Sequence, residues 1–120
     1  GQIVERRLYY DSRKFSESNT DRESLDSAGF SLVDCPTRNR KETLDKKLIV
    51  DIMAFACHNA AHRNPSCVVL ITSDGDYAYT LSKIRDFGVK TIVIHGPSIT
   101  TAGILFHVCE HVLSFHDDVL

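Results

Sequence analysis

The chain has 120 residues, of which 42% are hydrophobic and 25% are charged, and its formal net charge is −2. This length and composition allow one domain with a real core, without a metal or disulfides to hold it together. The small net charge excludes a global field that attracts polyanions. Any nucleic-acid binding must therefore come from a local basic patch.

The four cysteines lie inside or beside apolar runs and show no paired C-x-x-C spacing. We expect reduced, buried thiols and no disulfide-linked partner, as in an intracellular protein. The apolar runs are only strand-length, and no charged-then-apolar leader begins the chain, so neither membrane insertion nor secretion is expected. These features favour a cytoplasmic protein, with the nucleus as the alternative compartment.

Strand and helix signals alternate along the chain. In the first half we expect a strand at 3–10, a polar loop at 12–22, a helix at 23–28, a strand at 30–35 and a basic loop at 36–43. In the second half we expect a helix at 44–62, a strand at 67–72, a helix at 77–87, a strand at 90–95, a helix at 98–109 and a strand at 112–115. Such alternation predicts an α/β fold with right-handed crossovers and a mostly parallel sheet.

The apolar strand at 67–72 runs directly into two acids separated by glycine, Asp74 and Asp76. Ligands of α/β sheets bind at the carboxyl ends of the strands, and neighbouring carboxylates suit Mg²⁺ or Mn²⁺. The alternative is structural, with Asp76 capping a helix that begins near Tyr77. Spacing alone does not separate the two interpretations.

The long helix supplies a third acid. Its apolar residues recur at helical spacing and form one stripe: Leu48, Ile49, Ile52, Phe55 and Ala56. Asp45 lies on the same stripe, at the start of the helix. We expect its carboxylate over the sheet edge where the loop with Asp74 and Asp76 emerges. The alternative is an ordinary first-turn acid that the helix dipole favours.

Three motifs in this order resemble an NYN domain, a branch of the PIN-like metal-dependent nucleases. They are Lys41-x-x-Leu44-Asp45-x-x-Leu48, Ser73-Asp74-Gly75-Asp76-Tyr77 and Leu81-x-x-Ile84-x-x-Phe87-Gly88-x-Lys90. The meiosis-arrest-type NYN proteins of eukaryotes look nearest, because residues 91–115 also resemble their closing strand, helix and short strand.

The resemblance implies a single NYN domain over residues 1–120, folded as a three-layer α/β/α sandwich. It also implies hydrolysis of single-stranded RNA with Mg²⁺ or Mn²⁺. By motif, Asp45, Asp74 and Asp76 carry over as the catalytic and metal-holding acids. They would hold one or two ions that polarise the phosphate and lower the pKa of a bound water, with Thr72 and Ser73 positioning a water.

One departure from the family concerns its first strand, which normally ends in an aspartate that anchors the metal. Asp11 lies too near Asp45 in the sequence to be that residue, so the strand and its acid look absent and the domain looks truncated at its N-terminus. That strand is central in the family's sheet, and unpaired backbone groups in a sheet centre are costly. We therefore expect the gap to be filled. Either the 3–10 strand lies beside the 67–72 strand, or a second copy completes the sheet in a homodimer.

A basic cluster flanks Asp45 and is expected to contact RNA phosphates: Arg38, Arg40, Lys41, Lys46 and Lys47. Its structural alternative is a solvated face. Lys46 stands where several nucleases of this class carry a second acid, and a cation there weakens metal binding.

Other functions also fit the residues. A catalytically lapsed NYN domain would serve as an RNA-binding or protein-interaction module. Asp74-Gly75-Asp76 also resembles the DxD of nucleotide-sugar glycosyltransferases, although those enzymes are generally much longer. Half of a zinc site could come from His58 and His62 or from the group His107, Cys109 and His111, but no second half has suitable spacing.

Overall fold

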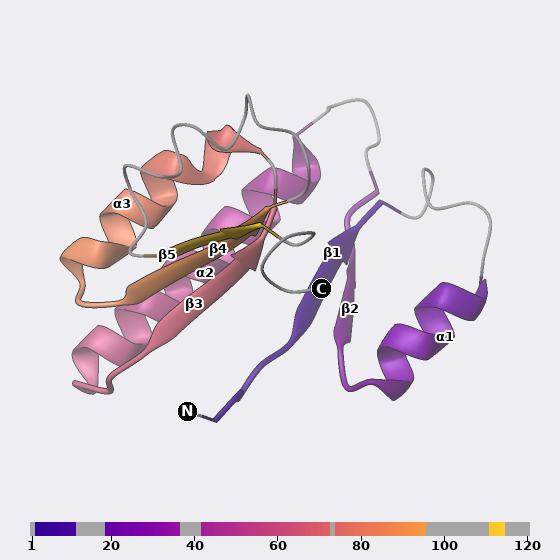
Figure 1. The fold of residues 1–120 in the computed structure, drawn as a ribbon, viewed down its shortest axis with the longest axis horizontal. Helices are drawn as coiled ribbons and strands as arrows, with labels where there is room; N and C mark the ends of the chain where they lie inside the picture. Colours follow the sequence, from indigo (N-terminus) through magenta and orange to yellow (C-terminus); the bar gives the residue numbers. More distant parts are fainter. Residues whose placement is uncertain (1, 12–18, 37–41, 73, 96–110, 115–120) are drawn as a thin grey trace. The chain divides into compact units, whose positions relative to one another are not determined.

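The computed structural model describes residues 2–11, 19–36, 42–72, 74–95 and 111–114. The chain divides into two compact units, residues 1–48 and 49–120. The elements in chain order are β1 (Arg7–Tyr10), α1 (Asn19–Ser27), β2 (Ser31–Asp34), α2 (Thr43–Ala61), β3 (Cys67–Ile71), the 3₁₀ helix η1 (Gly75–Tyr77), α3 (Ala78–Asp86), β4 (Lys90–His95) and β5 (His111–Ser114) (Figure 1). The described strands pair in parallel, so the predicted α/β class is confirmed.

The first unit contains β1, α1 and β2, with β1 parallel to β2 from Arg7 opposite Ser31 to Tyr10 opposite Asp34. Parallel neighbours need a crossover connection, and α1 lies in that connection. The helix ends at Ser27, and Gly29 follows in the turn with a φ of 91°, which suits glycine. The amide of Phe30 donates to the Leu25 carbonyl at 3.0 Å and closes the turn.

Two predictions for this unit need correction. The strand expected at 3–10 begins only at Arg7, because β2 offers four partner residues, and Ile3 and Val4 are highly exposed. The polar loop expected at 12–22 is helical from Asn19 onward. Its residues carry no apolar stripe, so periodicity gave no signal for a helix there.

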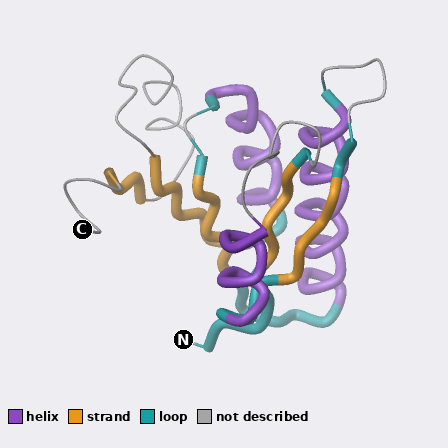
Figure 2. Tube along the Cα trace, turned by 90° about the vertical axis from the view of Figure 1, so that its right-hand side faces the viewer, coloured by secondary structure: helices purple, strands orange, loops and turns teal. Residues whose placement is uncertain are grey.

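The second unit is built on a sheet with the order β3-β4-β5. Leu70 lies opposite Val93 in the ladder and both are buried, whereas Val69 and Ile71 on the alternate face of β3 are 53% and 64% exposed. The core therefore lies on one face of the sheet. It also contains buried residues of α2 and α3: Ile52, Ala56, Leu81 and Ile84. Figure 2 colours the helices of this unit purple and its strands orange.

The long helix α2 confirms the predicted element to within one residue at each end. Ile52 and Ala56 of the predicted stripe are buried, whereas Val50 is 64% exposed on another side of the helix. None of the described helices combines the length and hydropathy needed to cross a membrane. The helix expected at 98–109 lies outside the described residues.

Strand β3 is an edge strand in the described sheet. The Thr72 amide donates to Ile94 and the Ser66 carbonyl accepts from Lys90, so these residues turn their backbone groups toward β4. Because backbone direction alternates along a strand, Val69 and Ile71 turn theirs toward the outer edge. The neighbour of β1 in its own sheet is β2, so the described ladders do not contain the predicted pairing of the 3–10 strand with β3. Pairing with a second copy stays a prediction.

This edge gives a testable expectation for the oligomeric state. An uncharged apolar edge strand readily pairs with another chain, so we expect a dimer in sedimentation velocity. Val69→Lys places a charge on the edge and is expected to return a monomer. Val50→Lys makes the same change on α2 and is expected to leave the dimer intact. A monomer at every concentration of the unchanged chain would contradict the expectation.

Gly88 after α3 offers a test of the backbone. Its φ is 82°, and a Cβ there meets no atom within 4 Å, so a side chain adds strain but no clash. We expect Gly88→Ala to lower the free energy of unfolding by about 1 kcal/mol in urea denaturation. Gly88→Asn should lose less, because asparagine tolerates this conformation better. Equal stability of the alanine variant and the unchanged chain would contradict the positive φ of Gly88.

Candidate functional site

Asp74 and Asp76 lie where β3 ends, in the predicted position. The Asp74 amide donates to Thr72 Oγ1 at 3.1 Å, and Asp74 Oδ1 accepts from the Asp76 amide at 2.9 Å. These two bonds tie the acids and the threonine into one short network. The Thr72 hydroxyl therefore orients the backbone of Asp74, whereas its expected role in positioning a water stays a prediction. Ser73 lies outside the described residues.

The turn that carries these acids is anchored in the core. Asp74 has extended backbone angles, φ −91° and ψ 118°, and caps the 3₁₀ helix η1, which leads into α3. Tyr77 and Ala78, the next residues after Asp76, are each only 4% exposed. The acids are therefore held between the end of a strand and two buried side chains.

The structural alternative, in which Asp76 caps the helix, needs correction. The side chain that caps the helical segment belongs to Asp74, because the turn begins with a 3₁₀ helix two residues before the expected start. Asp76 is exposed and Asp74 is half-buried. A capping role and a ligand role are compatible, because Asp74 has a second carboxylate oxygen.

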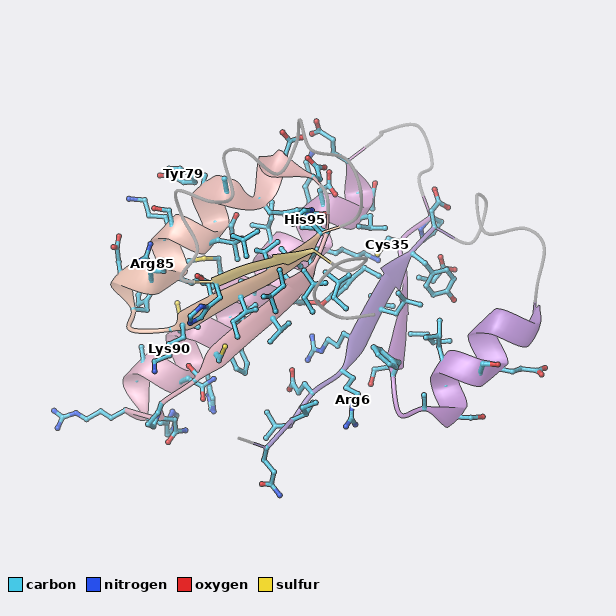
Figure 3. The ribbon with its side chains drawn as sticks, in the orientation of Figure 1. Arg6, Cys35, Tyr79, Arg85, Lys90 and His95 are labelled. Atoms are coloured by element: carbon cyan, nitrogen blue, oxygen red, sulfur yellow. The ribbon has the colours of Figure 1, made fainter. Side chains whose placement is uncertain are left out.

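The acids lie at the carboxyl edge of the second unit's sheet. The Thr72 amide donates to the Ile94 carbonyl at 2.9 Å, which aligns the end of β3 with the end of β4. His95 ends β4, is half-buried and is labelled in Figure 3. Sequence reasoning missed this histidine. The signal that could have found it is a titratable residue that closes a buried strand just before Gly96 and Pro97.

Asp45 belongs to the first unit. It lies in the first turn of α2 and is half-buried, as expected for an acid on the core-facing side of that helix. The described geometry does not relate the first unit to the second. The convergence of Asp45 with Asp74 and Asp76 therefore stays a prediction.

The basic cluster is described only in part. Lys46 and Lys47 are exposed at the start of α2, and the Lys47 ammonium donates to the Asp34 carbonyl at 3.3 Å. This contact holds Lys47 against the end of β2. Arg38, Arg40 and Lys41 lie outside the described residues, so their expected role in phosphate binding stays a prediction.

The half zinc site at His58 and His62 has a local structural explanation. The two rings lie on one helix with centroids 4.3 Å apart, and His62 Nδ1 lies 2.8 Å from the His58 carbonyl oxygen. The histidines thus interact with each other and with the helix backbone. His107 and Cys109 lie outside the described residues.

The donor chemistry at the end of β3 suits a hard divalent cation, because Asp74, Asp76 and Thr72 offer carboxylate and hydroxyl oxygens. Among the described residues, no three His, Cys, Asp or Glu side chains form a group that could hold a metal ion. The kind of donor therefore fits Mg²⁺ or Mn²⁺, and the described set needs at least one more acid.

Comparisons with known proteins support the family and the fold of this chain. The sequence matches the NYN domain family over residues 1–116. No curated protein matches it. The structure is similar to a crystal structure of a protein of unknown function from Vibrio parahaemolyticus, with a TM-score of 0.75, 20% identity, and coverage of 98% of this chain and 72% of that one. At this identity the likeness shows a shared fold.

The hydroxyl of Thr72 provides a test of the network. Thr72→Val removes the acceptor of the Asp74 amide, and we expect it to lower the free energy of unfolding by about 1 kcal/mol in urea denaturation. Thr72→Ser keeps the hydroxyl and should retain most of that stability. If valine and serine variants unfold alike, the hydroxyl does not support the turn.

Proposed function

Because the chain belongs to the NYN family, within the PIN-like nuclease superfamily, we propose that it is a metal-dependent endoribonuclease domain acting on single-stranded RNA. The observation that carries the proposal is the acid pair at the carboxyl edge of the β3-β4-β5 sheet. Asp74 and Asp76 are held there by two hydrogen bonds and by the buried Tyr77. A preorganised anionic site of this kind suits phosphodiester chemistry.

In this proposal Asp45, Asp74 and Asp76 together hold Mg²⁺ or Mn²⁺, the class of cofactor that PIN-like nucleases generally use. When bound, the ion supplies Lewis acidity that polarises the scissile phosphate and makes water a better nucleophile at neutral pH. The chain's own residues orient the acids of the turn. Thr72 fixes the Asp74 backbone, and Asp74 in turn fixes the amide of Asp76.

RNA binding in this proposal uses local positive charge, because the chain as a whole is slightly acidic. Lys46 and Lys47 present exposed ammonium groups in the first unit. Together with Arg38, Arg40 and Lys41 they would contact phosphates, which contributes affinity without sequence preference. The proposal places the domain in the cytoplasm, with the nucleus as the alternative compartment.

The proposal includes membership of the meiosis-arrest-type branch of the family. Its support is the resemblance of residues 91–115 to the closing strand, helix and short strand of that branch, of which the structure describes the two strands, β4 and β5.

The second candidate function is a catalytically lapsed domain that binds RNA or protein. It is favoured by the capping bond of Asp74, because a carboxylate that organises a turn is useful in a domain without activity too. Lys46, directly after Asp45, also weakens the case for metal binding at that helix.

Asp74→Asn separates the two functions. Asparagine keeps an oxygen that can cap the turn but removes the negative charge, so the fold should survive. We expect cleavage of an end-blocked single-stranded RNA in Mn²⁺ to fall by roughly 100-fold or more, since charge stabilisation by the ion is worth several kcal/mol.

Asp26→Asn at the exposed end of α1 is the matched control and should cleave like the unchanged chain. Equal cleavage by the Asp74→Asn variant would reject the acid pair as the site. If the unchanged chain binds RNA but cleaves none in Mg²⁺ or Mn²⁺, the lapsed module is the better function.

A further inference from the structure

The outer side of α3 and the residue that caps its C-terminus carry two exposed aromatic side chains, with a lysine between them in the sequence. Tyr79 is 74% exposed, Phe87 is 43% exposed, and Lys83 lies between them at helical spacing. Tyr79 and Lys83 are four apart on α3 and share one side, and Phe87 follows at the C-cap of the helix. These three residues are here named the Tyr79–Lys83–Phe87 stripe. Figure 3 shows Tyr79 on the side of α3 that faces away from the β3-β4-β5 sheet.

The stripe is separate from the core side of the same helix. Ala78, Leu81 and Ile84 are buried, so packing already uses the other side of α3. An exposed tyrosine alone is ordinary, but an exposed tyrosine and lysine on one side of a nine-residue helix, followed by an exposed phenylalanine at its C-cap, are more informative.

Lys83 places its charge near one of the rings. Its Nζ lies 5.4 Å from the centroid of the Tyr79 ring. An aromatic face combined with a nearby cation is what a single-stranded nucleic acid requires, because bases stack on the ring and phosphates meet the charge. Both basic residues of the last turn, Lys83 and Arg85, are exposed, while Asp86 contributes one opposing charge.

The position of the stripe along the chain also matters. Tyr79 follows Asp76 by three residues, in the first turn of the helix that begins directly after the acid turn. The end of β3, η1 and the stripe all belong to the second unit. A strand of RNA with a phosphate at the acids therefore has a stacking surface on the helix that begins there.

We propose that the Tyr79–Lys83–Phe87 stripe is a base-stacking subsite for single-stranded RNA flanking the scissile phosphate. The proposal rests on the proposed ribonuclease function for its ligand, but it concerns binding and needs no catalysis. Tyr79 and Phe87 stack with bases, and Lys83 neutralises a phosphate between them. Such stacking tolerates any base sequence.

Fluorescence anisotropy with labelled oligouridylate and oligoadenylate, in EDTA so that nothing is cleaved, tests the subsite. Tyr79→Ala is expected to weaken binding by about 5- to 100-fold, the range found for loss of one stacking ring. Tyr79→Phe keeps the ring and should bind nearly as the unchanged chain does. Val50→Ala removes an exposed apolar side chain from α2 and should change nothing.

Two further measurements distinguish base stacking by Tyr79 from phosphate binding by Lys83. On an oligonucleotide with abasic positions, the penalty of Tyr79→Ala should disappear, since no base remains to stack. Lys83→Gln should reduce the slope of log affinity against log salt by about one, while Tyr79→Ala leaves the slope unchanged. Unchanged binding by Tyr79→Ala, or an equal penalty on the abasic strand, would overturn the proposal.

The outcomes also separate this subsite from the nuclease itself. If the unchanged chain never cleaves but Tyr79→Ala weakens base-dependent binding, the ribonuclease function fails and the subsite stands. If cleavage requires Asp74 but Tyr79→Ala binds normally, the subsite fails alone. If Tyr79→Ala and Phe87→Ala leave RNA binding intact but abolish self-association in sedimentation, the stripe is a protein contact and the proposal is wrong.

Discussion

The hydrogen bond from the Asp76 amide to the Asp74 carboxylate is the constraint on which the candidate site depends. It converts the end of a strand into the start of a helix within three residues, and the Thr72 hydroxyl supports it from the strand side. Buried Tyr77 holds the helix side. Two acids are thereby kept near the sheet edge by local bonds, at a place where α/β folds bind their ligands.

The elements that the sequence predicts best are those with a clear local signal, such as flanking glycines or an apolar stripe. Strand β4 was placed at its observed residues, because a β-branched run lies between Gly88 and Gly96. Helix α2 was placed by its apolar stripe, which the burial of Ile52 and Ala56 confirms. Where boundaries depend on a partner, the sequence was a poorer guide. Ile3 and Val4 have strand propensity, yet β1 is only as long as its pairing with β2.

The candidate site also has features that the sequence predicts and features that it does not. The acid pair was predictable, because both residues follow one strand and local geometry decides where they lie. Which of them caps the turn was not, since a 3₁₀ segment before α3 leaves no periodic signal. The stripe on α3 was also missed. Tyr79 and Phe87 resemble core residues in sequence, and only their exposure in the fold distinguishes them.

The anchored turn has a consequence for how this domain can vary. Thr72 is bonded into the ladder with β4, and Tyr77 is buried, so the turn between them has two fixed end points. An insertion there would have to break the ladder or pull the ring from the core, whereas loops far from the sheet edge can lengthen at small entropic cost. Adaptation to a larger or differently shaped substrate is thus expected through surrounding loops, with the length of this turn kept constant.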